Sequence, residues 1–178
     1  MISQNGISVK SKKIFSKVAD QQLFTRIYEA HYDAIFRLCK GYFSGEESLA
    51  ADATQEVFMK VWQHLAKFRA EAKISTWLYR IAVNTCLSYL RKASVKREFK
   101  TDQLPEVAAE AYNPVMEDRL KKMYSCIQQL DETGKFIILM VLEGLEYSAI
   151  AEVVGLREET LRVRIHRIKQ QLSNCVQI

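Results

Sequence analysis

One stretch of the sequence, residues 75–92, carries side chains whose chemistry suits nucleic-acid binding. It contains no Gly or Pro, so it predicts an uninterrupted helix that begins at Ser75. At about 100° per residue, one face of that helix carries Trp77, Arg80, Asn84, Ser88 and Arg91. Guanidinium and hydroxyl groups bind phosphates, amides hydrogen-bond to base edges, and aromatic rings stack on exposed bases. The opposite face is largely apolar, so the helix is predicted to have a core side and a nucleic-acid side. From this segment alone, an ordinary solvated face is the alternative.

A second group of cations lies near the end of the chain, in residues 147–172. The small, glycine and apolar order of Ala151, Gly155 and Leu161 is typical of a helix-turn-helix, whose second helix is predicted to begin near Glu158. The faces of that helix outside the core carry, just after Arg157, the side chains of Thr160, Arg162, Arg164, His166, Arg167 and Lys169. A cation-rich helix of this kind fits the major groove of DNA. A helical hairpin with no DNA role is the alternative.

A row of acid and amide side chains lies on a third predicted helix. Ser44 to Glu47 fits a capping box that opens this helix, which is predicted to end near Ala66. Opposite its apolar face lie Asp52, Gln55 and Glu56. Such a row is either an ordinary wet face or a surface that docks a basic helix of another protein.

The sequence predicts neither an enzyme nor a metal or cofactor site. Its four cysteines, Cys39, Cys86, Cys126 and Cys175, are widely spaced and only three His are present, so metal-ligand spacing is absent. The cysteines are predicted to be free thiols of a cytoplasmic protein. The longest apolar run, residues 136–142, is too short to span a bilayer, so no membrane insertion is expected.

The elements that position these groups predict an all-α chain of two small helical domains. The 178 residues are 48% apolar, which is enough for real cores, and carry a formal net charge of +5. Residues 1–18 are predicted to form a mobile basic tail and residues 19–93 the first domain. Residues 94–113 predict a flexible acidic linker, because the periodicity fades there and both prolines of the chain lie nearby. Residues 114–178 are the second domain, with Pro114 at its first helical position.

The second domain has its own predicted centre. Asp131 or Thr133 is expected to cap a helix whose apolar run continues nearly all round, and Gly144 to end it. A linker of roughly 20 residues reaches at most about 70 Å, so two such modules can contact separate sites on one duplex. Residues 101–118 hold five acidic residues and no Lys or Arg, so the rest of the chain carries a net charge of +10. A basic body favours a polyanionic partner, and charge alone leaves open whether that is nucleic acid or an anionic membrane surface.

Three blocks of the sequence resemble the extracytoplasmic-function (ECF) group of bacterial sigma-70 factors, from about Phe24 to Leu172. The first is similar to region 2.2 and reads Asp52-x-x-Gln55-Glu56-Val57-Phe58-x-x-Val61-Trp62. The second is similar to regions 2.3 and 2.4 and runs from Phe68 through Ser75-Thr76-Trp77-Leu78-Tyr79-Arg80-Ile81-Ala82-x-Asn84 to Leu90-Arg91-Lys92. The third is similar to region 4.2 and contains Gly144-Leu145, Ile150-Ala151, Gly155-Leu156 and Thr160-Leu161-x-x-Arg164-Ile165-His166-Arg167.

The resemblance implies an alternative sigma factor that directs core RNA polymerase to promoters and is not itself an enzyme. It implies that the β′ clamp helices of the polymerase are contacted by Asp52, Gln55 and Glu56, with the β subunit as a further partner. It implies contacts to the −10 element from Arg80, Asn84, Ser88, Arg91 and Lys92. It implies contacts to the −35 element from Arg157, Thr160, Arg162, Arg164, His166, Arg167 and Lys169. Promoter DNA and an anti-sigma factor are the other partners that the resemblance implies.

Three positions depart from the family's pattern. Ser88 stands where many members have Asp, Glu146 where a capping Ser is usual, and Arg157 where the recognition helix often opens with Ser. These differences bear on the promoter sequence more than on the role, because a wrong base contact costs only about 1–3 kcal/mol.

Two other hypotheses are open at this point. A helix-turn-helix repressor or activator that binds operators as a dimer explains the C-terminal segment, but it leaves the acid and amide row and the row from Trp77 to Arg91 without a function. A helical adaptor with no DNA role predicts little salt-dependent binding to DNA.

Overall fold

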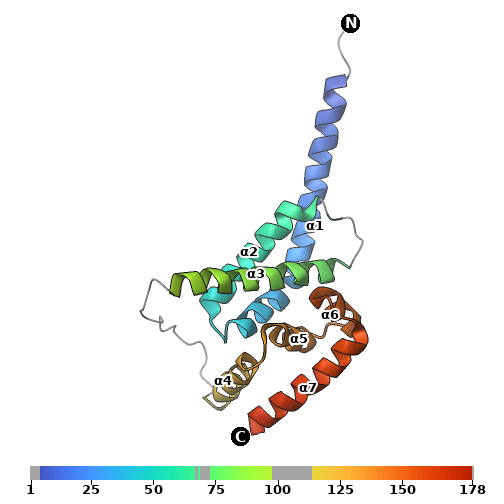
Figure 1. Ribbon diagram of the computed structural model, residues 1–178. Coiled ribbons are helices and arrows are strands. Elements are labelled where there is room, and N and C mark those ends of the chain that lie inside the picture. The colour runs from blue at the N-terminus through green and yellow to red at the C-terminus, as the bar shows by residue number, and fades with distance from the viewer. Residues whose placement is uncertain (1–4, 67, 69–72, 98–113, 178) are drawn as a thin grey trace.

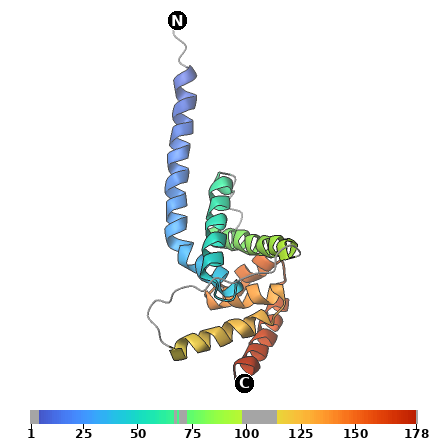
Figure 2. The same ribbon diagram turned by 90° about the vertical axis from the view of Figure 1, so that its left-hand side faces the viewer.

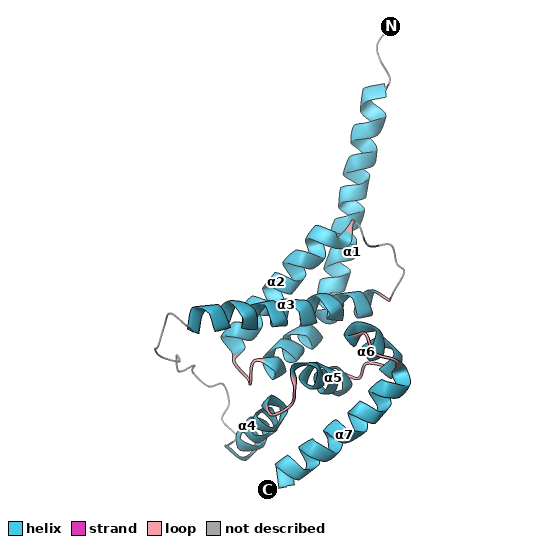
Figure 3. Ribbon diagram, in the orientation of Figure 1, coloured by secondary structure: helices cyan, strands magenta, loops and turns pink. Residues whose placement is uncertain are grey.

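The structure, a computed structural model, describes residues 5–66, 68, 73–97 and 114–177. Within these ranges the chain folds into helices and has no strand, which confirms the predicted all-α class (Figures 1 and 3). The helices are α1 (Asn5–Tyr42), α2 (Glu47–Leu65), α3 (Ile74–Arg97), α4 (Pro114–Gln128), α5 (Glu132–Leu142), α6 (Tyr147–Val154) and α7 (Glu158–Gln177). The N-terminal end of α1 extends well beyond the other helices (Figure 2). Residues 5–18, expected as a tail, are therefore helical in the structure.

Helices α1, α2 and α3 pack together around apolar side chains that recur every three or four residues. The fully buried members include Ile35 and Leu38 on α1, Val57 and Val61 on α2, and Leu78 and Ala82 on α3. This spacing places one stripe of each helix in the core and leaves the opposite stripe in solvent. The predicted core face of α3 is thereby confirmed, and it fixes which edge of α3 is available to a partner.

Helix α5 packs against α6 and α7 and is buried along most of its length, from Gly134 to Met140. The Asp131 side chain accepts a hydrogen bond from the Gly134 backbone N–H at 3.2 Å, as predicted for the cap of α5. Gly155 lies between α6 and α7 with a φ of 70°, a left-handed conformation that favours glycine. The predicted helix-turn-helix is therefore present, with Leu161 and Ile165 of α7 buried in the core.

The two groups of helices share one continuous core, because α5 lies against α1 and α6 lies against α3 (Figures 1 and 2). The Tyr42 ring stacks on Phe136 with centroids 4.3 Å apart, and the Tyr42 hydroxyl donates to Glu132 at 2.5 Å. Gly41 permits the close approach of α1 and α5, since an added Cβ would lie 2.3 Å from Leu139 Cδ2. The last turn of α1 is thus the junction between the two groups.

Two predicted helix caps are wrong. Ser44 has a φ of 60° and lies in the turn, while Glu46 precedes α2 and makes no capping hydrogen bond with its side chain. Helix α3 begins at Ile74, so Ser75 lies inside it. The same helix continues to Arg97, into the segment that was predicted as linker, and residues 98–113 of that segment lie outside the described residues.

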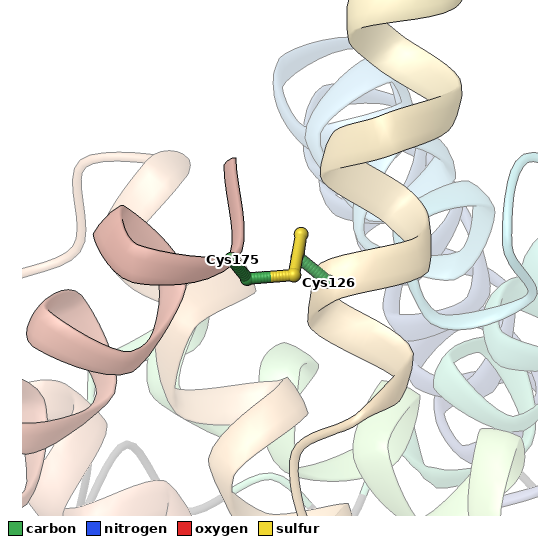
Figure 4. Close-up of a disulfide and its surroundings, with 2 residues drawn as sticks. All are labelled: Cys126 and Cys175. Carbon is green, nitrogen blue, oxygen red and sulfur yellow. A yellow bond between two sulfur atoms is a disulfide. The ribbon is translucent and has the colours of Figure 1, made fainter. Parts of the chain in front are cut away.

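The prediction of free thiols is wrong for one pair of cysteines. Cys126 on α4 and Cys175 near the end of α7 form a disulfide, with Cα atoms 5.9 Å apart (Figure 4). Their sequence separation of 49 residues gave no sign of the contact, because only the packing of α4 against α7 brings them together. Cys39 and Cys86 are free and buried, as predicted.

Candidate nucleic-acid and protein interfaces

The predicted nucleic-acid row follows one edge of α3. Arg80, Asn84 and Arg91 are exposed, Ser88 is half-buried, and the side chain of Lys92 lies outside the described residues. Trp77 is half-buried because its ring packs against Phe68, with ring centroids 4.9 Å apart. The row therefore presents two guanidinium groups, an amide and a hydroxyl on one side of one helix, which is the chemistry that binds phosphates and base edges.

One end of this row is in contact with the helix-turn-helix. An NH2 group of Arg80 donates to the backbone carbonyl of Glu152 on α6 at 2.9 Å and lies 3.5 Å from Glu152 Oε1. Both side chains are about half exposed, so the ion pair is a weak one in water. A phosphate that binds this NH2 group of Arg80 competes with Glu152 for it.

Further carboxylates of the C-terminal helices meet polar groups of the N-terminal helices. Glu143 accepts from Arg37 Nε at 2.9 Å and from an Arg37 NH2 group at 2.7 Å, and Glu146 lies 3.4 Å from Lys73 Nζ. The contacts Tyr42–Glu132 and Arg80–Glu152 have the same polarity: in each, the donor belongs to the N-terminal group of helices and the glutamate to the C-terminal group. We call the packing of the two groups of helices against each other the closed arrangement. Electrostatic contacts contribute to its stability, so that stability is sensitive to salt.

The acid and amide row lies on α2, with Asp52 and Gln55 exposed and Glu56 half-buried. Glu56 forms an ion pair with Lys60 at 2.7 Å, and Lys60 also donates to the Thr85 hydroxyl on α3 at 3.0 Å. Burial raises the pKa of Tyr89 on α3, and the negative charges of Glu56 and Asp52 raise it further. Glu56 thus contributes to the α2–α3 contact, whereas Asp52 and Gln55 face solvent.

An aromatic groove beside this row was not predicted from the sequence. Its walls come from α1 and α2 and enclose about 530 Å³, lined by Phe24, Tyr28, Tyr32, Ala51, Asp52, Gln55, Phe58, Met59 and Trp62. Tyr28, Met59 and Trp62 are 40%, 54% and 43% exposed, which is unusual for large apolar side chains. The available signal was the four-residue spacing of aromatic residues along α1, at positions 24, 28, 32 and 36. Exposed aromatic rings beside carboxylate and amide groups are typical of protein-docking surfaces.

The predicted DNA-contacting residues of the C-terminal group lie on and just before α7. Arg157, Thr160, Arg162, His166, Arg167 and Lys169 are exposed, and Arg164 is half-buried. Arg162 forms an ion pair with Glu158 at 2.5 Å and lies 5.3 Å from the centroid of the Tyr147 ring. Arg164 forms an ion pair with Asp131, the cap of α5, so its guanidinium supports the module's own structure. The other predicted cations, Arg157, Arg167 and Lys169, are exposed to solvent.

Two other kinds of site are absent from the described part of the chain. It contains no cluster of three or more His, Cys, Asp and Glu side chains that could hold a metal ion. None of its helices is long and apolar enough to cross a membrane.

Comparison with known proteins decides the family. The model of sigma-70 region 2 matches residues 27–95, and the model of sigma-70 region 4 matches residues 120–172. The ECF RNA polymerase sigma-E factor of Haemophilus influenzae is 32% identical over 173 residues, which cover 89% of each chain. The protein of the same name from Escherichia coli K12 is 28% identical over 89% of this chain and 88% of its own. The chain belongs to the ECF sigma-70 factor family.

Solved structures agree with this fold. CnrH, solved in complex with the cytosolic domain of CnrY, superposes with a TM-score of 0.69 at 21% identity, over 88% of this chain and 89% of its own. The sigma factor RpoE of Bartonella quintana, solved in complex with the anti-sigma factor NepR, gives a TM-score of 0.70 at 18% identity, over 87% and 97%.

Membership of the sigma family settles the choice among the hypotheses. The chain is an ECF sigma factor that directs RNA polymerase, and it is not an enzyme. The repressor hypothesis had left α2 and α3 without a function, whereas the region 2 match includes both helices.

Proposed function

We propose that this sigma factor uses three separate surfaces, one for core RNA polymerase and two for promoter DNA. The observation that carries the proposal is their arrangement: the α2 row with its aromatic groove, the α3 row and the exposed face of α7 lie on different helices. α5 and α6 lie between α3 and α7 (Figures 1 and 2). One molecule can therefore contact a protein and two DNA segments together, and the joined contacts reinforce one another.

The polymerase surface consists of Asp52, Gln55 and Glu56 with the neighbouring groove. Exposed Asp52 and Gln55 supply acceptors for a basic helix such as a β′ clamp helix, and Trp62 and Met59 supply apolar contact area. Glu56 acts from the edge, because Lys60 already pairs with it. The β subunit is the second polymerase contact that we expect.

The DNA surfaces follow from the exposed donors. The −10 element is contacted by Arg80, Asn84, Ser88, Arg91 and Lys92. An amide can hydrogen-bond to bases that leave the duplex, and aromatic side chains can stack on them. The −35 element is contacted by α7, which lies in the major groove, through Arg157, Thr160, Arg162, His166, Arg167 and Lys169. Arg164 is a weaker candidate for a direct DNA contact, because Asp131 holds its guanidinium.

An anti-sigma factor is the proposed regulator, and the cytoplasm the proposed compartment. The support is that both solved neighbours described above are complexes, one with the cytosolic domain of CnrY and one with the anti-sigma factor NepR. Holding the modules closed keeps Arg80 on Glu152, so a partner that binds both modules in this arrangement withholds the −10 surface.

Affinity for core polymerase tests the docking surface. We expect the double variant Asp52→Ala, Gln55→Ala to bind core enzyme about tenfold more weakly, which corresponds to about 1.4 kcal/mol. Glu29→Ala is the matched control, because Glu29 is an exposed carboxylate of α1 that does not line the groove. Equal affinity of the double variant and wild type would refute the docking assignment and leave the family membership untouched.

A further inference from the structure

The four cysteines form two spatial pairs with different surroundings. Cys39 on α1 and Cys86 on α3 are free thiols whose sulfur atoms lie 3.7 Å apart, and both side chains are fully buried. Cys126 on α4 and Cys175 on α7 are joined by a disulfide at the far end of the C-terminal group (Figure 4). One chain thus holds a protected dithiol and an oxidised pair.

The disulfide fastens the last turns of α7 to α4. The first half of α7 is anchored by Leu161, Ile165 and Ile168, all buried, whereas beyond them Leu172 is only partly buried. Cys175 is the next inward-facing residue after Leu172, one turn further on. The bond to Cys126 therefore adds a covalent link between the end of α7 and α4.

The two sulfur atoms of this pair are suited to different chemical roles. Cys175 is partly exposed, so a small oxidant can reach it, whereas Cys126 is 3% exposed. Cys175 is the candidate for attack on an oxidant, and Cys126 is the thiol that resolves the product.

We propose that Cys126 and Cys175 are a reversible thiol-oxidation site for hydroperoxides. In the first step the Cys175 thiolate attacks hydrogen peroxide, breaks the O–O bond and becomes a sulfenic acid, and the released hydroxide takes up a proton to give water. In the second step the Cys126 thiolate attacks the Cys175 sulfur, and the sulfenic oxygen leaves as a second water. Two thiols and one peroxide thus give one disulfide and two waters, and a dithiol or glutathione reverses the change.

The location of the site gives the oxidation a consequence for the recognition helix. The oxidised form links α7 covalently to α4, whereas in the reduced form only non-covalent packing holds the last turns of α7 against α4. Because α7 also carries the −35 surface, the redox state changes how firmly the helix that contacts the promoter is held. This consequence rests on the proposed function. A disulfide in a protein of the cytoplasm, the compartment proposed above, is expected to be of this reversible kind.

Thiol trapping on the full-length chain tests the proposal without using DNA. The protein is reduced, treated with increasing hydrogen peroxide, alkylated after denaturation and mapped by peptide mass spectrometry. We expect a linked Cys126–Cys175 peptide, with Cys39 and Cys86 still alkylated, and loss of the linked peptide when reduced glutathione is added. Cys175→Ser is the matched variant, because it removes the partly exposed thiol and leaves the buried core intact.

Thermal unfolding of the same samples supplies the second readout. Closing a loop of 49 residues predicts that the oxidised wild type melts higher than the reduced form by on the order of 10 °C, with no such difference for Cys175→Ser. Thiols at Cys126 and Cys175 that survive peroxide would overturn the proposal, as would a disulfide that resists glutathione in the native protein. Equal oxidation of Cys39 and Cys86 would overturn the assignment of the site to this pair. Neither readout uses DNA, so failure of the proposed DNA-binding function would leave both results unchanged.

Discussion

A bulky side chain at Gly41 should separate the two groups of helices. A Cβ at this position would already lie 2.3 Å from Leu139 Cδ2, more than 1 Å inside the contact distance of about 3.5–4.0 Å for carbon atoms. Leu139 is 5% exposed, so its side chain has little room to move aside. The substitution Gly41→Leu adds three further carbon atoms beyond that Cβ and acts as a wedge between α1 and α5.

The magnitude follows from two opposing effects. Overpacking of a filled core costs about 1–3 kcal/mol, while replacing a helical glycine returns about 0.5–1 kcal/mol. We expect a net shift of about 1.2 kcal/mol against the closed arrangement, which lowers the ratio of closed to open molecules about eightfold. The weak polar contacts across the junction, at about 0–1 kcal/mol each, are too small to offset this shift one at a time.

Small-angle scattering and amide hydrogen exchange measure this opening. Gly41→Leu should increase the radius of gyration and accelerate exchange in α5, while circular dichroism reports unchanged helix content. Ala30→Leu is the control, because Ala30 is exposed on the same helix and the added bulk meets solvent. If Gly41→Leu and Ala30→Leu give the same scattering profile and the same exchange of α5 as wild type, the reasoning about the junction is wrong.

Three further predictions concern the junction, the cap of α5 and the DNA surface. Burial opposes ionisation of Glu132, but hydrogen bonds from Tyr42 and Lys135 outweigh it and lower the pKa of Glu132. The resulting stability is present above the ordinary pKa of about 4.5 and is lost as the pH falls through the lowered value. In urea unfolding, Tyr42→Phe should therefore lower the unfolding free energy by about 1 kcal/mol at pH 7, a modest amount because the Glu132 carboxylate is half exposed. The loss should be smaller at pH 3, and an equal loss at both pH values would contradict this. Asp131→Ala should lower the unfolding free energy by about 1 kcal/mol and the melting temperature by about 2–4 °C, and an unchanged melting curve would count against the cap. Arg167→Ala should reduce the slope of log affinity for promoter DNA against log salt by about 1, with no change for the neutral control Gln170→Ala; equal slopes would remove Arg167 from the DNA surface.

Features set by neighbours in the sequence could be predicted, and features set by packing could not. The periodic apolar residues of α7 and the Asp131 cap depend on contacts within one or two turns, so the sequence alone located them. The stacking of Tyr42 on Phe136 joins a residue of α1 to a residue of α5, and no local pattern encodes it. The Cys126–Cys175 disulfide escaped prediction for the same reason.

The surfaces show the same division. The exposure of Arg80, Asn84 and Arg91 follows from the helical period once the core stripe of α3 is known. The contact between Arg164 and Asp131 could not be predicted in this way, because the two residues are 33 positions apart in the sequence. The aromatic groove was hidden for a related reason, since Trp62 and Tyr28 match a core pattern but α1 and α2 leave them partly uncovered.

Promoter-dependent transcription tests the central claim most directly. Core RNA polymerase is supplied with fragmented DNA from the source genome and with either the wild type or the triple variant Asp52→Ala, Gln55→Ala, Glu56→Ala. We expect discrete transcription start sites with the wild type and their loss with the triple variant. Failure of the wild type to initiate, together with specific DNA binding by the protein alone as a dimer, would contradict it.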